Sequence, residues 1–240
     1  EAVFRMNDGT LALTSDASPT LWYSSDEAIT WRSCGGAIGG NHPSVTQLSD
    51  GTLFAFTREN PIDGKMPYIT SSDKGLNWTY KPSEFPVIHG GQRLVLLKLQ
   101  EGPLFFASFA DKGILITDAD GVQRKVRGLF AAVSTDEGKT WPYRRLVSDD
   151  GPGTPVESLN GGLFTMSART GEHLGYMSTC QATNGVIHLI TSRTDYAFNL
   201  KWLMTPAKPI KYPPLPVAAV IETFNGPKFD NDGWVDYKSY

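Results

Sequence analysis

One eight-residue phrase occurs three times in this chain of 240 residues. It reads SSDEAITW at Ser24–Trp31, SSDKGLNW at Ser71–Trp78 and STDEGKTW at Ser134–Trp141, and the copies begin 47 and 63 positions apart. Self-similarity at such a period is the signature of an array of similar supersecondary units. This repeat therefore constrains the fold more than any other feature of the sequence.

The phrase has the chemistry of a turn between two strands. Its Asp can accept hydrogen bonds from the loop backbone, and its Gly can adopt the positive φ that other residues resist. Its Trp offers a large apolar ring for burial between neighbouring sheets, with an indole N–H that needs a partner. We expect each copy to join the two outer strands of one unit.

A second repeat marks a hairpin in each unit. Asp-Gly, Asn-Gly or a related pair stands between apolar runs at Asn7–Leu11, Ser49–Leu53, Gln100–Leu104 and Thr183–Ile187. Such pairs are strong hairpin signals, and each is expected to join an inner strand to the next strand outward. With 24 Gly, 16 Pro and 11 % aromatic residues, the chain is predicted to be all-β, with four-stranded sheets stacked as propeller blades.

Four blades are expected, at about residues 1–40, 42–88, 89–149 and 172–212. In the second blade the predicted strands are His42–Leu48, Thr52–Arg58 and Tyr68–Ser72, with a fourth after Trp78. The long connection at 151–171 is either a hairpin over the channel mouth or a shortened blade. Residues 1–212 are thus predicted to form the propeller, and residues 213–240 a Pro-rich linker and the start of a further β segment or domain.

The repeated phrase resembles the Asp-box, or BNR repeat, of the sialidase (neuraminidase) superfamily, and this resemblance covers roughly residues 1–205. It implies an antiparallel β-propeller of the sialidase type, with the boxes on its rim. Propellers of that family have six or seven blades, so the resemblance implies that four blades are part of a longer polypeptide, continuing at both ends. It also implies a secreted or periplasmic protein, although no signal peptide is visible.

Charge and composition exclude several classes of partner. The net charge is −3 and no basic tract occurs, so no nucleic-acid partner is expected. No apolar run approaches the 18 residues of a membrane-spanning helix, so no membrane partner is expected either. No cofactor is predicted from the sequence. Cys34 and Cys180 allow one disulfide at most, and free buried thiols are the simpler interpretation.

Three of the four histidines stand at equivalent places. His42 and His89 open the inner-strand stretches of two successive blades, and His173 immediately precedes that of the next. His188 lies within VIHLI and is expected to be packed. Repeat geometry would direct the three toward one axis, unless each caps its own loop. They could also hold Zn²⁺, but the usual close spacing of zinc ligands is missing, so no metal site is predicted.

Several arginines also occupy similar positions near the ends of predicted strands. Arg58, Arg169 and Arg193 each end a predicted strand, and Arg93 lies just after His89. A guanidinium holds a carboxylate through two parallel hydrogen bonds. Arginines converging on an axis therefore favour an acidic sugar as the ligand.

Tyr176 is the second residue of a segment, GYMSTCQATNGVIHLIT, that resembles a late-blade segment of sialidases. In those enzymes a tyrosine there is the nucleophile, a glutamate activates it, and an arginine triad binds the sugar carboxylate. The resemblance implies that Tyr176 is the nucleophile, and that Arg169 or Arg193 belongs to the triad.

The activating glutamate is harder to place. The Asn-Glu-Pro phrase of sialidases has only Gly153-Thr154-Pro155 here, and their Arg-Ile-Pro phrase has only Arg5-Met6-Asn7. Glu157 is the predicted substitute, while Glu59 and Glu172 are other carboxylates near strand ends.

Three functions follow from these residues. The first is an exo-α-sialidase-type glycoside hydrolase acting on an acidic glycan or polysaccharide. The second is a uronate polysaccharide lyase, in which histidine and tyrosine would supply the base and the acid and arginine would neutralise the carboxylate; its residues would be His42, His89, His173, Tyr176 and Tyr196. The third is a non-catalytic sugar-binding propeller that stacks sugars on Tyr196 and Trp202.

Overall fold

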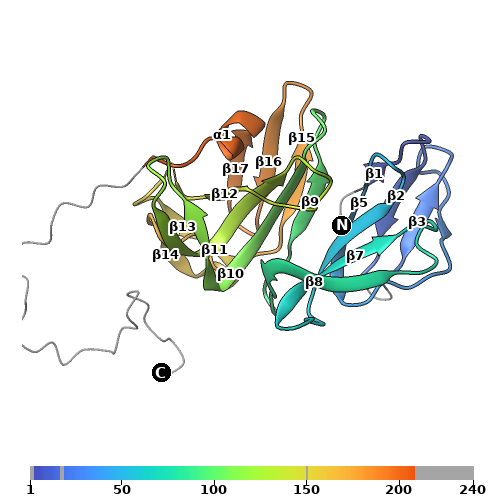
Figure 1. Cartoon of the computed structure of the whole chain (residues 1–240), viewed down its shortest axis with the longest axis horizontal. Coiled ribbons are helices and arrows are strands. Elements are labelled where there is room, and N and C mark those ends of the chain that lie inside the picture. Colours follow the sequence, from blue (N-terminus) through green and yellow to red (C-terminus); the bar gives the residue numbers. More distant parts are fainter. Residues whose placement is uncertain (1–2, 17–18, 150, 209–240) are drawn as a thin grey trace, which may run out of the picture. The chain divides into compact units, whose positions relative to one another are not determined.

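Hairpins account for almost the whole of the computed structural model, which describes residues 3–16, 19–149 and 151–208 (Figure 1). These residues belong to one compact unit that ends at residue 209. The predicted linker and β segment at 213–240 lie outside the described residues. No helix among the described residues is long and apolar enough to cross a membrane.

Each of four sheets is built from strands in sequence order and forms one blade. Blade 1 contains β1 (Phe4–Arg5), β2 (Leu11–Thr14), β3 (Leu21–Ser24) and β4 (Arg32–Ser33). Blade 2 contains β5 (Asn41–Gln47), β6 (Leu53–Arg58), β7 (Lys65–Ser71) and β8 (Thr79–Pro86). Blade 3 contains β9 (Val95–Lys98), β10 (Leu104–Thr117), β11 (Gln123–Ser134) and β12 (Tyr143–Leu146).

Blade 4 departs from this plan. It contains β15 (Ser178–Gln181), β16 (Val186–Ile190) and β17 (Asp195–Asn199), and the short helix α1 (Leu200–Met204) follows where a fourth strand was expected. The side chain of Asn199 caps this helix by accepting a hydrogen bond from the Trp202 backbone N–H. An Asn in extended backbone immediately before Leu-Lys-Trp-Leu-Met is a helix start, and the prediction of a fourth strand missed it.

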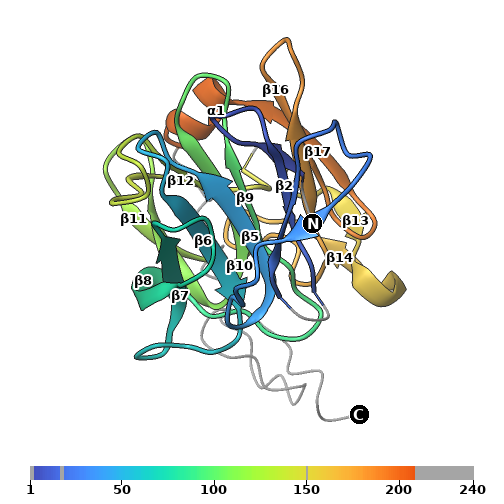
Figure 2. The ribbon, with the colours of Figure 1, turned by 90° about the vertical axis from the view of Figure 1, so that its right-hand side faces the viewer.

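The four sheets confirm the predicted antiparallel β-propeller arrangement. The inner strands of successive blades contact one another, β5 with β9 and β9 with β15. Figure 2 shows β5 and β9 side by side, where Ser44 Oγ accepts a hydrogen bond from the Leu96 N–H at 2.9 Å.

The hairpin turns form where the second repeat predicts them. At the turn between β5 and β6, Asp50 accepts a hydrogen bond from the Thr52 N–H at 2.9 Å, and Gly51 has a φ of 90°. An Asp that caps its own turn, followed by a residue in the left-handed region, is the combination that the sequence indicates.

The three copies of the eight-residue phrase fold alike. In the third copy, Ser134 Oγ accepts the Gly138 N–H at 2.8 Å, and Asp136 accepts the N–H and the hydroxyl of Thr140 at 2.9 and 2.6 Å. Trp141 is 3 % exposed and donates its indole N–H to the Gly138 carbonyl at 3.2 Å. Each copy joins the third strand of its blade to the fourth, at the outer side of the sheet.

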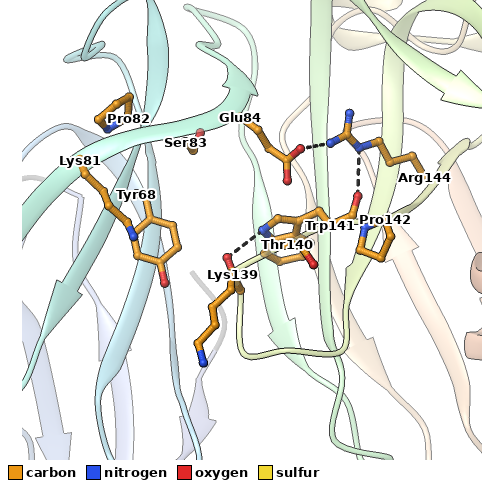
Figure 3. Close-up of a pocket in the computed structure, with 11 residues that line it drawn as sticks. Tyr68, Lys81, Pro82, Ser83, Glu84, Lys139, Thr140, Trp141, Pro142 and Arg144 are labelled. Atoms are coloured by element: carbon orange, nitrogen blue, oxygen red, sulfur yellow. Dashed lines mark hydrogen bonds and ion pairs between the residues drawn. The ribbon is translucent and has the colours of Figure 1, made fainter.

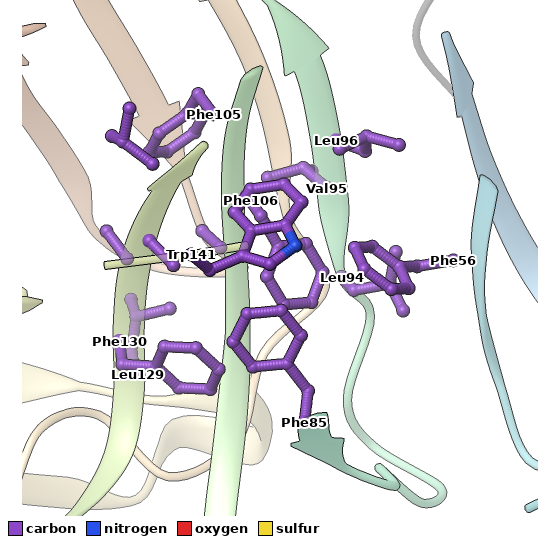
Figure 4. Packing of buried hydrophobic residues seen from close by; sticks show 14 of the residues in the cluster. Phe56, Phe85, Leu94, Val95, Leu96, Phe105, Phe106, Leu129, Phe130 and Trp141 are labelled. Atoms are coloured by element: carbon purple, nitrogen blue, oxygen red, sulfur yellow. The ribbon is translucent and has the colours of Figure 1, made fainter. Parts of the chain in front are cut away.

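The main core extends from blade 2 through blade 3 to blade 4, and most of its aromatic rings lie between blades 2 and 3 (Figure 4). Phe106 is fully buried and lies within 6 Å of four other rings, those of Phe56, Phe85, Phe130 and Trp141. Offset and edge-on ring pairs of this kind stabilise a core beyond the area that they bury. A second cluster, which includes Leu21, Leu53 and Ile69, lies between blades 1 and 2.

The connection at 151–171 contains a two-stranded hairpin of β13 (Pro155–Glu157) and β14 (Leu163–Thr165), with a 3₁₀ turn at Leu159–Gly161. A two-stranded sheet fits both predicted alternatives, the hairpin over the channel mouth and the shortened blade, so both stay predictions. The long β10–β11 hairpin of blade 3 packs beside the end of this connection, because the Arg127 N–H donates to the Arg169 carbonyl at 2.8 Å.

Both cysteines are free thiols. The expectation that they are buried is wrong, because Cys34 is half-buried and Cys180 is exposed on β15. Cys34 instead donates a weak hydrogen bond to the Gly75 carbonyl of the neighbouring blade, with its Sγ at 3.4 Å.

Candidate functional site

Five side chains from all four blades meet at the ends of the inner strands. Asp16 follows β2 in blade 1, His42 is the second residue of β5 and Arg58 ends β6 in blade 2, Arg93 precedes β9 in blade 3, and Tyr176 precedes β15 in blade 4. We call these five residues the four-blade cluster. The sequence predicted four of them, and the structure brings those four together.

Asp16 is the centre of the cluster. Its Oδ2 atom lies 2.8 Å from His42 Nδ1 and accepts a hydrogen bond from Arg93 Nη2 at 2.6 Å. Arg93 Nη2 lies 2.9 Å from the same Nδ1 atom, so the donor or acceptor role of this nitrogen depends on the tautomer. We assign the proton to Nδ1, where it can be donated to the closer Asp16 oxygen. The lone pair of His42 then lies on Nε2.

The surroundings of His42 favour the neutral form of its imidazole. Partial burial lowers its pKa below the usual value, and the nearby cations Arg93 and Arg58 act in the same direction, against the opposing effect of Asp16. A neutral histidine oriented by a carboxylate is the arrangement of a general base.

His42 also has an unusual backbone. Its φ is 51°, and the pairing of β5 with β6 shifts register between Asn41 and Ser44. Bulges re-aim side chains next to functional sites, and a non-glycine residue with positive φ is tolerated only where its surroundings enforce it. Glu59, at the end of the facing strand, likewise has a φ of 68°.

Tyr176 covers the other side of His42. The two rings meet edge to face with centroids 5.5 Å apart, and the Arg93 guanidinium lies 5.3 Å from the tyrosine ring centre. The Tyr176 hydroxyl is 3.5 Å from Arg58 Nη1, and its backbone N–H donates to Ser192 Oγ at 2.9 Å. Tyr176 is 37 % exposed, so solvent and ligands can reach it.

The Arg58 side chain is fixed in place by contacts with its neighbours. It is 9 % exposed, donates to the Gln92 carbonyl at 3.3 Å, and lies 3.3 Å from a Glu59 carboxylate oxygen through its Nε. Asn41 in turn donates to Glu59 at 2.6 Å. A buried guanidinium fixed in this way presents its remaining N–H groups in a defined direction.

His173 belongs to a neighbouring group rather than to the cluster. Its ring packs edge-on against Phe164 of β14, 5.6 Å away, and its carbonyl accepts a hydrogen bond from Gln92 Nε2 at 3.0 Å. The same Gln92 nitrogen donates to Asp111 at 2.7 Å. Burial lowers the pKa of His173, with Asp111 opposing the change.

Other predicted site residues lie elsewhere. His89 is exposed in the loop before β9, and Arg169 is exposed beside the β10–β11 hairpin. Arg193 and Glu157 face each other across 3.8 Å, both about half exposed. Among the described residues no group of three His, Cys, Asp or Glu side chains is arranged so that it could hold a metal ion, and this includes His42, His89 and His173.

The half-buried Tyr196 is hydrogen-bonded to the buried Glu172. Glu172 is fully buried and accepts hydrogen bonds from the Tyr196 hydroxyl at 2.9 Å and from Thr191 Oγ1 at 3.1 Å. Burial raises the pKa of Glu172, and burial together with this carboxylate raises the pKa of Tyr196. The Tyr196 hydroxyl thus points to a buried carboxylate, while Tyr196 and Trp202 both line a pocket of about 380 Å³. Sugar stacking on these two rings stays a prediction.

Sequence reasoning missed Asp16. An aspartate just after a strand has the ordinary appearance of a turn residue. The available signal was positional, because Asp16 comes at the end of the second strand of blade 1, as Arg58 does in blade 2.

Comparison with known proteins places these repeats in a family. The model of the BNR repeat-like domain matches residues 3–189. The chain belongs to this family. The match confirms the resemblance to sialidase-type propellers that the eight-residue phrases indicated. A comparison with curated proteins found no match.

Solved structures resemble the BNR-repeat chain only distantly. A Dyadobacter fermentans protein of unknown function is 15 % identical with a TM-score of 0.48, over 82 % of this chain and 50 % of that one. A mannose phosphorylase from Leishmania mexicana is 10 % identical with a TM-score of 0.39, over 87 % and 71 %. A fucose lectin from Kordia zhangzhouensis is 12 % identical with a TM-score of 0.31, over 60 % and 95 %. The chain thus spans about half the length of the Dyadobacter protein.

Proposed function

We propose that this BNR-repeat chain is part of a carbohydrate-active enzyme that acts on an acidic sugar within a glycan or polysaccharide. One observation carries the proposal: His42 Nδ1 lies 2.8 Å from Asp16, and the accessible Tyr176 lies beside the same imidazole. A base and an acid are therefore adjacent, next to two guanidinium groups. Because the substrate is a glycan or polysaccharide, the proposal includes a secreted or periplasmic location.

The reaction that this geometry supports best is elimination at a uronate unit. Arg58 and Arg93 would bind the substrate carboxylate and stabilise the negative charge that develops there. His42 Nε2 would remove the proton at C5, and that C–H electron pair would form the C4–C5 double bond as the C4–O bond breaks. Tyr176 would give its proton to the departing oxygen. The products are an unsaturated uronate end and a free hydroxyl end.

Exo-α-sialidase activity is the second candidate. It is favoured by an accessible tyrosine whose hydroxyl lies 3.5 Å from a guanidinium. That mechanism also needs a carboxylate to activate the tyrosine. Within the described ranges no carboxylate hydrogen-bonds to the Tyr176 hydroxyl, since Glu157 faces Arg193 and Glu172 binds Tyr196. For this reason we rank the lyase first.

Two assays on the purified chain separate these reactions. Ultraviolet absorbance of the unsaturated uronate reports elimination on uronate polymers, and release of free sialic acid from a sialoglycoconjugate reports hydrolysis. We expect the absorbance signal to appear, and to be lost in His42→Gln and Tyr176→Phe.

His89→Gln is the matched control, because His89 precedes the inner strand of blade 3 and His42 is the second residue of that of blade 2, but His89 is exposed and lies outside the cluster. It should retain full activity. Sialic acid release without elimination would reject the lyase in favour of the sialidase. Sugar binding with neither reaction would identify a non-catalytic binding protein.

A further inference from the structure

A cleft of about 500 Å³ opens at the rim between blades 2 and 3, and none of its lining residues belongs to the four-blade cluster. Figure 3 shows Tyr68 and Lys81 of blade 2 on one wall, and Lys139 and Trp141 of the third Asp-box on the other. We call it the rim cleft. Its volume lies within the range of roughly 300–1,000 Å³ that is usual for small-ligand sites.

The repeat supplies an internal comparison, because the corresponding space between blades 1 and 2 is closed. There Cys34 Sγ contacts the Gly75 carbonyl at 3.4 Å, and a Cβ added to Gly36 would lie 1.9 Å from that same carbonyl oxygen. Three residues after the box Trp, blade 1 has Cys34-Gly35-Gly36 where blade 2 has Lys81-Pro82-Ser83. Small residues let the next box close onto blade 1, whereas the bulkier segment of blade 2 lines an open cleft.

The box that forms one wall is rigid. Asp136 binds both the N–H and the hydroxyl of Thr140, and Ser134 binds the Gly138 N–H. Trp141 beneath them is 3 % exposed and packs among the rings of the main core. A wall already fixed in place spares a ligand the entropy cost of ordering it.

Three cations and one carboxylate, Glu84, line the rim cleft, although the chain carries a net charge of −3. Asp50 acts electrostatically on Lys139, and Asp50 and Asp136 act on Tyr68. Lys81 and Lys139 line the cleft, and neither ammonium group forms an ion pair within the described ranges; Lys81 Nζ instead lies 4.1 Å from the centre of the Tyr68 ring. The remaining cation, Arg144, is already paired with Glu84. At the closed junction the positions of Lys139 and Lys81 are occupied by the uncharged Leu76 and Cys34.

We infer that the rim cleft is a second sugar site, which binds a carboxylated sugar unit independently of the four-blade cluster. The two lysines would approach the carboxylate as point charges, and Pro82 would contact the C–H face of the sugar. The restricted volume suits one or two sugar units rather than a folded partner. A chain that carries such a site can hold an acidic polysaccharide at its rim while another part of the polymer occupies the four-blade cluster.

Amide chemical shifts test this site directly on the 240-residue chain, with glucuronate as the probe and glucose as its neutral match. We expect glucuronate to shift the amide signals of Lys81, Lys139 and Thr140 in a saturable way, and glucose to shift them much less. The double variant Lys81→Gln/Lys139→Gln should bind glucuronate at the rim about tenfold more weakly, which is the combined effect of two solvated ion pairs. Added salt should weaken the wild-type interaction.

Lys65→Gln is the control, because Lys65 is an exposed lysine of β7 outside the rim cleft. It should leave the titration unchanged. Signals that shift only around Arg93 and Tyr176, or a double variant that binds as the wild type does, would overturn the inference. Saturation by inorganic sulfate at the same concentration would also overturn it, because a bare anion would then suffice. Since the readout is binding at named amides, the inference does not depend on whether the lyase assay succeeds.

Discussion

Asp149→Asn should destabilise the protein strongly, because the Asp149 side chain is 1 % exposed and lies between two buried guanidinium groups. It accepts Arg124 Nη2 at 2.5 Å and Arg145 Nε at 3.2 Å. Arg124 also binds Asp118, and Arg145 reaches the carbonyls of Trp202 and Thr205 after β17. This network joins blade 3 to the α1 region, so removing its central charge leaves two cations facing a single carboxylate.

The free energy of unfolding should fall by about 3–5 kcal/mol, the usual cost of breaking a buried ion pair from one side. For a domain of this size that corresponds to a melting temperature lower by roughly 6–20 °C. Urea unfolding followed by circular dichroism measures the change. The control is Glu27→Gln, which breaks a two-bond pair with Arg5 at 3.0 and 2.9 Å that is exposed on both sides. We expect no change in its midpoint. Equal midpoints for the two variants would refute the reasoning, because the loss of stability is expected to depend on the burial of the ion pair and not on its hydrogen-bond distances.

Three further outcomes are expected. Phe106→Ala should cost about 3–5 kcal/mol in urea unfolding, since it removes a fully buried ring from the main core. Tyr176→Phe should leave the unfolding midpoint close to that of the wild type, because its hydroxyl makes one long contact, but should lower the rate of the proposed reaction by roughly 10²–10⁴-fold. The Asp26 carboxyl should titrate by NMR at a pKa of about 2, because Thr30 and Ser24 donate hydrogen bonds to it. Since folding lowers this pKa from 3.8, its contribution to stability is present above pH 3.8 and is lost as the pH falls through about 2.

The sequence predicted the local structure well, because hairpins and Asp-boxes depend on residues a few positions apart. Asp50 and Thr52 determine one turn, and Ser134, Asp136 and Thr140 determine one box, whatever surrounds them. The failure came where a blade departs from the repeat. In blade 4, Asn199 caps a helix at the place where the pattern of the other blades predicts a strand.

The candidate site was harder to predict, because it depends on how far each residue stands from the start of its strand. His42 lies within β5 and joins the cluster, whereas His89 precedes β9 by six positions and stays in the loop. Both were assigned the same place from an approximate strand start. Tyr196 shows a second limit, since no local pattern indicates that its hydroxyl meets a buried glutamate.

The two proposed sites depend on different contacts between blades of the propeller. The four-blade cluster joins Asp16 to Arg93, which are 77 positions apart, and Arg58 to Tyr176, which are 118 positions apart, so it exists only when all four blades are stacked. The rim cleft needs only the contact between blades 2 and 3, which contains most aromatic rings of the main core. Loosening blade 4 should therefore displace Tyr176 and disable the four-blade cluster while the rim cleft still binds its sugar. In a repeat protein each unit contacts only its neighbouring units. Disturbing one blade can therefore abolish a site that includes it, while a site between two other blades persists.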